Sequence, residues 1–343
     1  MKQAVLVAPG RIEFHEVPIP QPERGQLLLQ IISLGICGSD IHAFHGEHRH
    51  VKFPFIQGHE VSAKVAEIGV GVDGFSLGQK VTIQPQIVCG KCYTCTHGKY
   101  HICENLKVMG FQAPGCASEY IVIDAAKVLR LPNEASFDQG AMVEPLAVAA
   151  HAASRTDEIS GKKILVLGAG PIGNLVAQTS MALGALSVMI TDVSNYRLEI
   201  ARKSGIQYCI NPIRQDLDQE ILRSFGKNKA DAIFECVGLG DTITQAVRSA
   251  RKGTDIVVVG VFGVEPRVNL GFLQRKELRL IGTHMYQQSD FEQAIKMLES
   301  KGINTELLIS DSFTFERYLE AYKYIEKKKD QVMKVIVRIG NAV

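Results

Sequence analysis

The stretch Gly168-Ala169-Gly170-Pro171-Ile172-Gly173 decides the fold of the second half of the chain. It follows the apolar run 163–167, which predicts a strand, and it opens the stretch 171–183, which has the periodicity of a helix. Asp192 ends the next apolar run, 24 residues after Gly168. This succession of strand, glycine turn, helix, strand and acid is typical of a βαβ unit that binds a dinucleotide.

The glycines of this stretch have a physical task in such a unit. They permit a tight turn and let the backbone approach a pyrophosphate, which the free N–H groups and the dipole of the helix N-terminus attract. A glycine-rich turn without a ligand would account for the glycines but not for the whole succession of elements. Asp192 is expected to bind the ribose hydroxyls of the adenosine. We therefore predict NAD as the cofactor, with these contact residues: Gly168, Gly170, Pro171, Ile172, Gly173 and Asp192.

Outward from this unit, the chain shows two kinds of pattern. From residue 163 to 259, short β-branched runs alternate with helical patterns, which predicts a doubly wound parallel sheet of the Rossmann type. Before about residue 150, strand-like runs such as 27–32 and 61–68 are separated by glycine, proline and aspartate turns. We predict an α/β protein with a β-rich catalytic domain over 1–153, a nucleotide-binding domain over 154–284, and a return to the first domain over 285–343.

Length and composition exclude several classes of protein. A chain of 343 residues suggests two domains, and 46% hydrophobic against 22% charged residues is ordinary globular usage. The net charge is only +2, and the basic run 327–329 is too short to hold a nucleic-acid backbone. A run of five apolar residues before Pro9 is too short for a secretory signal, and no apolar window approaches a membrane span. We expect a cytoplasmic protein that binds neither nucleic acid nor a membrane.

Four of the eight cysteines crowd into one short segment. Cys89, Cys92, Cys95 and Cys103 lie in a polar, glycine-containing loop, with the spacing of a closed, tetrahedral zinc site. Four buried thiols that merely fill space would be unusual in such a loop. A zinc ribbon that binds nucleic acid would need more basic and aromatic neighbours than this loop has. We predict a structural zinc ion here.

A second group of candidate ligands is scattered over the first 150 residues. Cys37 lies in Gly-Ile-Cys-Gly-Ser-Asp-Ile-His (35–42), His59 and Glu60 follow a glycine, and Glu144 precedes a proline. Sulfur, nitrogen and oxygen ligands together suit zinc, and three protein ligands leave a position open for water or substrate. Taken singly, Cys37 and His59 could be core residues and Glu144 a helix N-terminal charge, so the prediction depends on their combination.

The order of these motifs resembles that of the zinc-dependent medium-chain dehydrogenases over nearly the whole chain. Within that family, Glu144-Pro145-Leu146 followed by His151 is similar to the polyol, sorbitol-type branch, in which a glutamate replaces the second cysteine ligand. The resemblance implies a GroES-like, partly open β-barrel for the first domain. It also implies Cys37 and His59 as zinc ligands. By the same resemblance, Glu60 and Glu144 exchange two further roles, so that while one of them is a direct zinc ligand the other holds the zinc-bound water.

The remaining residues of the first motif fit proton transfer. Ser39 can accept the proton of an alcohol, and His42 can relay it towards the surface. Asp40 can hydrogen-bond the far nitrogen of a ligand histidine, or it can act as a turn cap. The predicted catalytic residues are Ser39, His42, Glu60 and Glu144.

Further cofactor contacts are expected at the carboxyl ends of the later strands, the edge at which parallel sheets bind ligands. By resemblance, Val237-Gly238 and Val259-Gly260-Val261 flank the ribose and the nicotinamide, and Arg197 lies near the adenosine unless it is only a surface charge. Thr283, His284 and Met285 are expected to line the cleft between the domains.

Two residues depart from the sorbitol-type pattern. Members of that branch typically carry an arginine before the tyrosine that is Tyr286 here, and an aromatic residue after the histidine that is His42. This chain has Met285 and Ala43 instead, which argues against sorbitol itself. Several cationic side chains nearby are either solvated or contact an acidic or phosphorylated polyol, namely His45, His48, Arg49 and His50.

Together these features predict a zinc- and NAD-dependent dehydrogenase, with one catalytic and one structural zinc ion. Its expected substrate is a secondary alcohol of a polyol, sugar alcohol or sugar acid, which it oxidises to a ketone. The runner-up is the oxidation of threonine, which uses similar ligands. A non-catalytic nucleotide-binding protein of the same fold is the alternative from another class. We expect a homodimer or a homotetramer.

Overall fold

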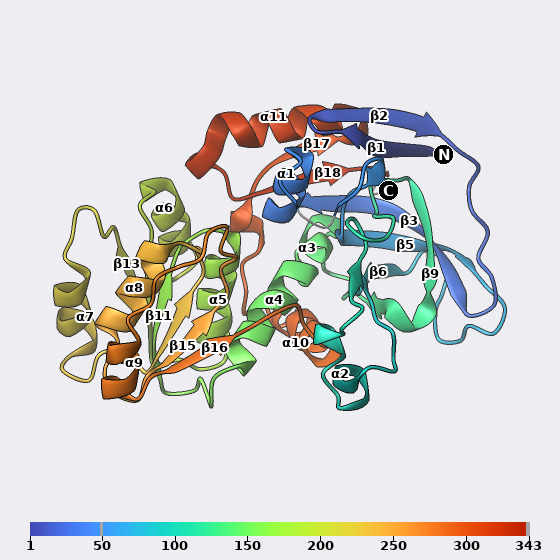
Figure 1. Cartoon of the computed structure of the whole chain (residues 1–343). Helices are drawn as coiled ribbons and strands as arrows, with labels where there is room; N and C mark the ends of the chain where they lie inside the picture. The colour runs from blue at the N-terminus through green and yellow to red at the C-terminus, as the bar shows by residue number, and fades with distance from the viewer. Residues whose placement is uncertain (49–50, 341–343) are drawn as a thin grey trace. The chain divides into compact units, whose positions relative to one another are not determined.

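The computed structural model describes residues 1–48 and 51–340, and the chain forms two compact units (Figure 1). The first unit consists of Met1–Glu144 and Ile309–Val343, and the second of Pro145–Leu308. The boundaries predicted after residues 153 and 284 differ from these. Helices α4 (Val143–Ser154) and α10 (Gln288–Glu299) are joined by a buried hydrogen bond of 2.8 Å between His151 and Asp290, which ties both helices into the second unit.

The second unit is built on one parallel sheet. Over residues 145–308, all of which are described, six strands are arranged in the order β13-β12-β11-β14-β15-β16. Strands β11 and β14 are neighbours although β12 and β13 separate them in the sequence, so the direction in which the sheet grows reverses between them. This is the doubly wound order that the sequence predicted. The strands are β11 (Lys163–Leu167), β12 (Ser187–Thr191), β13 (Tyr208–Ile210), β14 (Ala232–Glu235), β15 (Asp255–Val258) and β16 (Arg279–Gly282).

Burial explains the apolar character of these strands. Every residue of β11 and β12 after the first is buried, as expected where helices cover both faces of a parallel sheet. The predicted strands 163–167, 187–191, 231–236 and 255–259 and the predicted helices 171–183, 195–203 and 242–251 match the structure within two residues at each end. Among these residues β13 and α7 were not predicted, nor were α9 and β16 after them. The helices of this sheet are α5 (Pro171–Ala182), α6 (Asn195–Lys203), α7 (Leu217–Phe225), α8 (Gly240–Ser249) and α9 (Leu270–Lys276).

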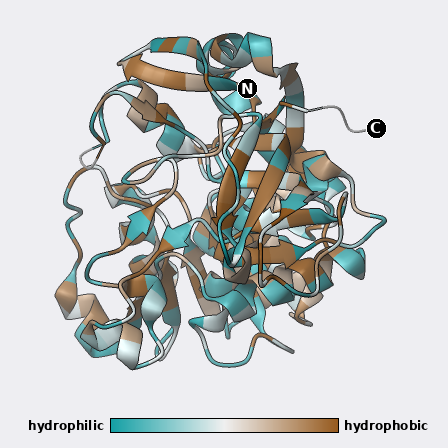
Figure 2. Ribbon diagram, turned by 90° about the vertical axis from the view of Figure 1, so that its right-hand side faces the viewer, coloured by the Kyte–Doolittle hydropathy of each residue, from teal (hydrophilic) through white to brown (hydrophobic). Residues whose placement is uncertain are grey.

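The described part of the first unit is built mainly of antiparallel strands. Its main sheet has the order β10-β6-β5-β3-β18-β17, and β9 also pairs with β3. In Figure 2 the strands carry much of the hydrophobic colour, in agreement with a core that includes Leu27, Leu29 and Ile31 of β3. The strands of this sheet are β3 (Gln26–Ile36), β5 (Glu60–Ile68), β6 (Lys80–Ile83), β9 (Tyr120–Asp124), β10 (Val128–Arg130), β17 (Ile309–Thr314) and β18 (Lys334–Arg338).

Smaller elements complete the first unit. Strands β2 (Arg11–Glu16), β1 (Lys2–Ala8) and β4 (Phe55–Ile56) form a second sheet, and β7 (Gln86–Ile87) pairs with β8 (Lys107–Val108). The helices that matter for the site are α1 (Gly38–Phe44), α2 (Tyr93–Thr96) and α11 (Tyr318–Lys328). Among the described residues, no helix combines the length and the apolar character needed to cross a membrane.

Candidate active site and metal centres

The four-cysteine loop brings its thiols together. The sulfur atoms of Cys89, Cys92, Cys95 and Cys103 all lie within 4.8 Å of one another. Cys103 Sγ is 3.8 Å from Cys92 Sγ and 3.5 Å from Cys89 Sγ. Sulfur atoms bound at about 2.3 Å to one tetrahedral zinc ion lie about 3.8 Å apart, so this donor set fits such an ion.

The surroundings of these thiols favour a thiolate. Hydrogen bonds from the Thr94 side chain and from the backbone N–H groups of Cys95 and Glu104 lower the pKa of Cys92 to about 5. Desolvation and the neighbouring thiols raise the pKa of Cys95 to about 12. The thiolate is the form that binds metals, so one ligand is already prepared and a cation would favour ionisation of the others.

Two neighbouring strands place the second group of candidate ligands. Cys37 follows β3, His59 and Glu60 stand at the start of β5, and the register pairs Gly35 of β3 with Glu60. A Cys37 sulfur, a His59 nitrogen and a Glu60 oxygen lie within 4.8 Å of one another. A Cβ atom at Gly35 would be 2.2 Å from Glu60 Oε2, so only a glycine leaves room for this carboxylate.

Glu144, the fourth predicted member of this group, is buried near the start of α4. Its negative charge acts on His59 and on Lys334, which places it in the same electrostatic environment. It does not belong to the three residues whose ligand atoms converge within 4.8 Å. The structure thus gathers Cys37, His59 and Glu60 most closely and adds Glu144 as a nearby acid.

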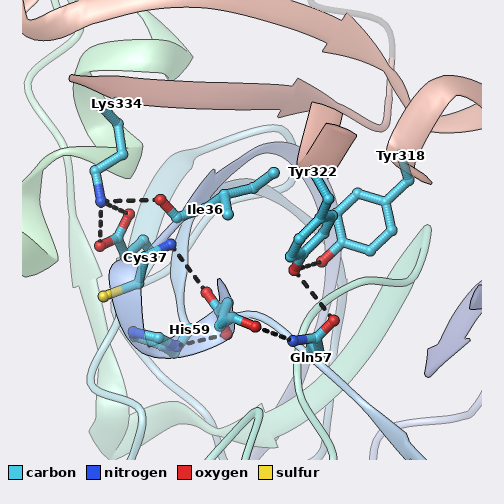
Figure 3. Close-up of polar contacts among 9 residues, drawn as sticks. Ile36, Cys37, Gln57, His59, Tyr318, Tyr322 and Lys334 are labelled. Carbon is cyan, nitrogen blue, oxygen red and sulfur yellow. Dashed lines mark hydrogen bonds and ion pairs between the residues drawn. The ribbon is translucent and has the colours of Figure 1, made fainter. Parts of the chain in front are cut away.

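Lys334 at the start of β18 is a residue of this group that the sequence analysis did not identify. Its Nζ donates to both oxygens of Glu60, at 2.6 and 2.7 Å, and to the carbonyl oxygen of Ile36 at 3.2 Å (Figure 3). Burial alone would lower the pKa of Lys334, but the charges of Glu60, Cys37 and Glu144 outweigh it and raise that pKa. A lysine inside the apolar run 332–337 was the signal available in the sequence.

Asp40 fills the capping role considered for it, and it faces His59 without the predicted hydrogen bond. Its Oδ2 accepts a hydrogen bond of 3.0 Å from the backbone N–H of Cys37 and so caps α1, while its Oδ1 faces His59 Nδ1 at 3.7 Å. Burial would lower the pKa of His59, but Asp40, the Cys37 thiol and Glu144 together raise it well above its ordinary value. Side chains that draw a proton onto a buried imidazole form a site that favours a cation, and a zinc ion fits this requirement.

Helix α1 carries the residues predicted to transfer the proton. Ser39 is half-buried and His42 is exposed. His42 Nδ1 and Glu47 Oε2 are 3.0 Å apart, and this hydrogen bond lowers the pKa of Glu47. Glu47 was not predicted, although an acid five residues after the histidine was visible in the sequence.

The nearby cationic side chains have partners within the chain. His45 Nε2 is 3.1 Å from Glu326 Oε1 of α11, and His48 stacks on Phe111 with 4.6 Å between the ring centroids. Arg49 and His50 lie outside the described residues. For His45 and His48 the contacts are therefore protein contacts, and substrate binding by this segment stays a prediction.

The glycine turn between β11 and α5 has the features of a phosphate cradle. Gly168 has φ +99°, and a Cβ at Gly173 would lie 1.9 Å from the Gly168 carbonyl oxygen, so neither position tolerates another residue. A Cβ at Gly170 would meet only Arg197, 3.9 Å away, so the backbone there faces open space. Helix α5 begins with Pro171, and no side chain caps its N-terminus. Free N–H groups beside open space fit a pyrophosphate.

Asp192 is held beside this turn by backbone groups. Its Oδ2 accepts a hydrogen bond of 2.8 Å from the N–H group of Ala169, and its Oδ1 accepts one of 2.8 Å from the N–H group of Ser194. Arg197 Nη1 lies 3.9 Å from Oδ2. Each carboxylate oxygen keeps a lone pair beyond these bonds. The acid is thus oriented and able to accept further hydrogen bonds from ribose hydroxyls.

The loops after β11, β14 and β15 meet at one edge of the sheet. A Cβ at Gly168 would lie 2.6 Å from Val237, and one at Gly238 would lie 2.4 Å from the Val261 carbonyl oxygen. Gly260 approaches Gly238 equally closely, and Val259 donates to the Glu235 carbonyl oxygen. The structure brings these predicted contacts together.

After β16, Thr283 donates to the carbonyl oxygen of Val258, and Met285 has φ +54°. His284 lies between these two residues, and its burial and the neighbouring His151 lower its pKa. These residues therefore lie in the second unit, next to the end of β15, and their contact with the cofactor stays a prediction.

Comparison with known proteins agrees with both units. Residues 23–133 match the family model of the alcohol dehydrogenase GroES-like domain, and residues 171–300 match that of zinc-binding dehydrogenases. The chain is 37% identical to 2-dehydro-3-deoxy-L-galactonate 5-dehydrogenase of Pseudoalteromonas atlantica, over 84% of each chain. It is 30% identical to sorbitol dehydrogenase of Bacillus subtilis, over 98% of this chain and 97% of the relative. It is also 30% identical to L-threonine 3-dehydrogenase of Pyrococcus abyssi, over 92% of each chain.

Solved structures show the same fold. An alcohol dehydrogenase of Escherichia coli complexed with NADH superposes with a TM-score of 0.91 at 28% identity, over 99% of both chains. A zinc-binding dehydrogenase of Sinorhizobium meliloti bound to NADP superposes with a TM-score of 0.90 at 26% identity, over 98% of this chain and 99% of that one. The two neighbours carry different nicotinamide cofactors.

Replacing one cysteine of the loop tests the closed metal site. We expect Cys92→Ser to lower the zinc content from about two ions per chain to about one and to lower the midpoint of thermal unfolding, because a structural zinc ion contributes to folding directly. Metal analysis and thermal unfolding measure both effects. Cys209→Ser, at a half-buried thiol outside the loop, is the matched control. Full zinc content and unchanged stability in Cys92→Ser would show that the loop is not a metal site.

A second prediction concerns the buried ion pair of Lys334 and Glu60. Lys334→Met leaves a buried carboxylate without its counter-ion, and we expect the metal-free protein to lose about 3–5 kcal/mol of stability. Lys334→Met combined with Glu60→Met should recover most of this loss, because an apolar pair needs no neutralisation. Urea unfolding of the metal-free wild type, Lys334→Met, Glu60→Met and the double variant measures the coupling. Equal losses in the single and double variants would contradict a direct pairing.

Proposed function

This chain belongs to the zinc-dependent medium-chain dehydrogenases, and from that premise we propose that it oxidises a secondary alcohol of a polyol, sugar alcohol or sugar acid to a ketone, with NAD as hydride acceptor. The convergence of Cys37, His59 and Glu60 beside α1 carries this proposal. The substrate class is supported by relatives named for a sugar-acid derivative and for sorbitol.

The metal-binding residues of the open site are assigned from their spacing. Cys37, His59 and Glu60 would hold a zinc ion, because their ligand atoms are the ones that converge. Glu144, buried nearby, would hold water or the substrate hydroxyl beside it. A zinc ion in this position supplies Lewis-acid chemistry, which makes an alcohol easier to deprotonate, and a bound nicotinamide supplies the hydride acceptor.

Residues of the chain move the proton. Ser39 Oγ takes it from the substrate hydroxyl and passes it to His42, whose exposed ring releases it to solvent. The hydrogen bond to Glu47 fixes the Nδ1 side of the ring and leaves Nε2 for the transferred proton. Asp40 holds the backbone of Cys37 and faces His59, so the ligands keep their orientation.

Two other functions remain to be separated by experiment. Oxidation of threonine is favoured by the threonine dehydrogenase relatives, and it would use the same ligands with an amino acid as substrate. A non-catalytic nucleotide-binding protein would need the cysteine loop but not the open site. The assembly into a homodimer or homotetramer is part of the proposal and is tested by light scattering.

A substrate panel with metal analysis tests the function. We expect NAD reduction with polyols or sugar acids but not with threonine, and about two zinc ions per chain. His59→Ala should lose one zinc ion and nearly all turnover but still bind NADH, because the glycine turn belongs to the second unit. Turnover of threonine alone would select the runner-up. One zinc ion in the wild type and no turnover of any substrate would select the non-catalytic function.

Asp192 makes the choice of cofactor testable. We expect NAD to be preferred over NADP by tenfold to several-hundredfold, about 1.4–3.5 kcal/mol, because the 2′-phosphate would replace a hydrogen bond to the carboxylate with like-charge repulsion. Asp192→Ala should reduce the preference, and Arg197, 3.9 Å away, would then favour the phosphate. The ratio of kcat/KM for the two cofactors measures this.

The control for this substitution is Glu199→Ala. It removes an exposed acid of α6, the helix that follows Asp192 in the sequence, and it should leave the ratio unchanged. A wild type that prefers NADP, or an Asp192→Ala variant with an unaltered ratio, would show that the carboxylate does not face the ribose.

A further inference from the structure

A line of buried polar side chains leads from helix α11 to helix α1 and ends beside His59 (Figure 3). Tyr318, Tyr322, Gln57 and Asp40 are each only 1% exposed. Tyr318 and Tyr322 belong to the C-terminal segment, whereas Gln57 lies two residues before His59. The line therefore joins two parts of the chain that are 265 residues apart.

The hydrogen bonds of this line all run in one direction. Tyr322 OH donates to Gln57 Oε1 at 3.1 Å, and Gln57 Nε2 donates to the Asp40 carbonyl oxygen at 2.9 Å. Since Tyr322 has a single hydroxyl proton, its bond of 3.2 Å with Tyr318 takes the proton of Tyr318. Loss of the Tyr322 hydroxyl thus breaks the link to Gln57, whereas loss of the Tyr318 hydroxyl leaves that link intact.

Burying an amide and two hydroxyls is unfavourable unless they are hydrogen-bonded, and apolar side chains would fill the same space without this requirement. What the line holds is Asp40. Gln57 binds the Asp40 carbonyl oxygen, the Asp40 carboxylate binds the Cys37 N–H group, and its other oxygen faces His59 Nδ1. The 3.7 Å between Asp40 Oδ1 and His59 Nδ1 is an ion-pair distance, so the position of the carboxylate acts on the ring through its charge, and carboxylates beside ligand histidines orient them.

Helix α11 contacts α1 at further points. The Tyr322 ring stacks on Phe44 with 4.6 Å between centroids, and Glu326 pairs with His45, the residue that follows α1. Helix α1 has seven residues, too few to be stable alone, so its position depends on such contacts. The same helix carries Ser39 and His42.

We propose that Tyr322, acting through Gln57, is a positioning residue for the open metal site: it sets Asp40 and thereby holds His59 in the orientation that binds the metal. The inference rests on the proposed function, because it takes Cys37, His59 and Glu60 as metal ligands. It adds that the C-terminal helix controls the affinity of a site whose ligands all precede residue 61.

Metal binding by the full-length protein tests the proposal without measuring turnover. Zinc affinity is obtained by competition with a chelator, and cobalt(II) in the open site gives a visible absorption spectrum that reports ligand geometry. We expect Tyr322→Phe and Gln57→Leu to weaken zinc binding at the open site by about 10–100-fold and to shift the cobalt spectrum. Tyr318→Phe, the matched control, should change the affinity by less than about threefold, since its loss removes only the outermost bond.

The outcomes separate this inference from the proposed function. Wild-type affinity and an unchanged cobalt spectrum in Tyr322→Phe and Gln57→Leu would overturn the inference while leaving the function in place. Equal weakening in Tyr318→Phe and Tyr322→Phe would also overturn it, because general loss of packing would then be the cause. A wild type that binds zinc only in the cysteine loop would overturn the proposed function first, and the inference with it.

Discussion

The register of β3 with its two neighbours is the constraint on which the open site depends. Gly35 pairs with Glu60 of β5 on one side and with Ile336 of β18 on the other, so the ends of three strands meet where Cys37, Glu60 and Lys334 stand. A shift of one residue would turn each side chain to the opposite face of the sheet. The buried residues of β3, such as Leu29 and Ile31, oppose that shift, so the core of the unit also aligns the ligands.

Charge explains why this end of the sheet suits a metal ion. Asp40, Glu60 and Glu144 are buried acids, and the buried Lys334 neutralises Glu60 directly. Buried carboxylates without a partner are unfavourable, and the negative charges around His59 raise its pKa, so the group gains positive charge through this imidazole. A zinc ion would replace that proton. Metal binding and the stability of the first unit are therefore coupled through the same side chains.

The sequence predicted the second unit better than the first because its contacts are local. The strand, the glycine turn, helix α5 and Asp192 follow one another within 30 residues, and each has a recognisable pattern. Strand β13 was missed because a three-residue strand leaves little periodicity. In the first unit the order of motifs indicated Cys37, His59 and Glu60, but Lys334 meets Glu60 across 274 residues of sequence. No local pattern specifies such a pairing. The place of α4 and α10 in the second unit likewise depends on the distant contact of His151 with Asp290.

The difference between local and long-range contacts also determines how well the sequence predicts the binding of cofactor and substrate. Under the proposed function, backbone groups and glycines would recognise the cofactor, and their positions depend on turn geometry that a short motif encodes. Side chains beside the open metal site would recognise the substrate, and these come from segments far apart in the sequence. At the two positions where polyol-type relatives are expected to carry an arginine and an aromatic residue, this chain has Met285 and Ala43. An apolar and a small side chain cannot supply the donors of an arginine, so polar recognition of a polyol would have to come from other residues.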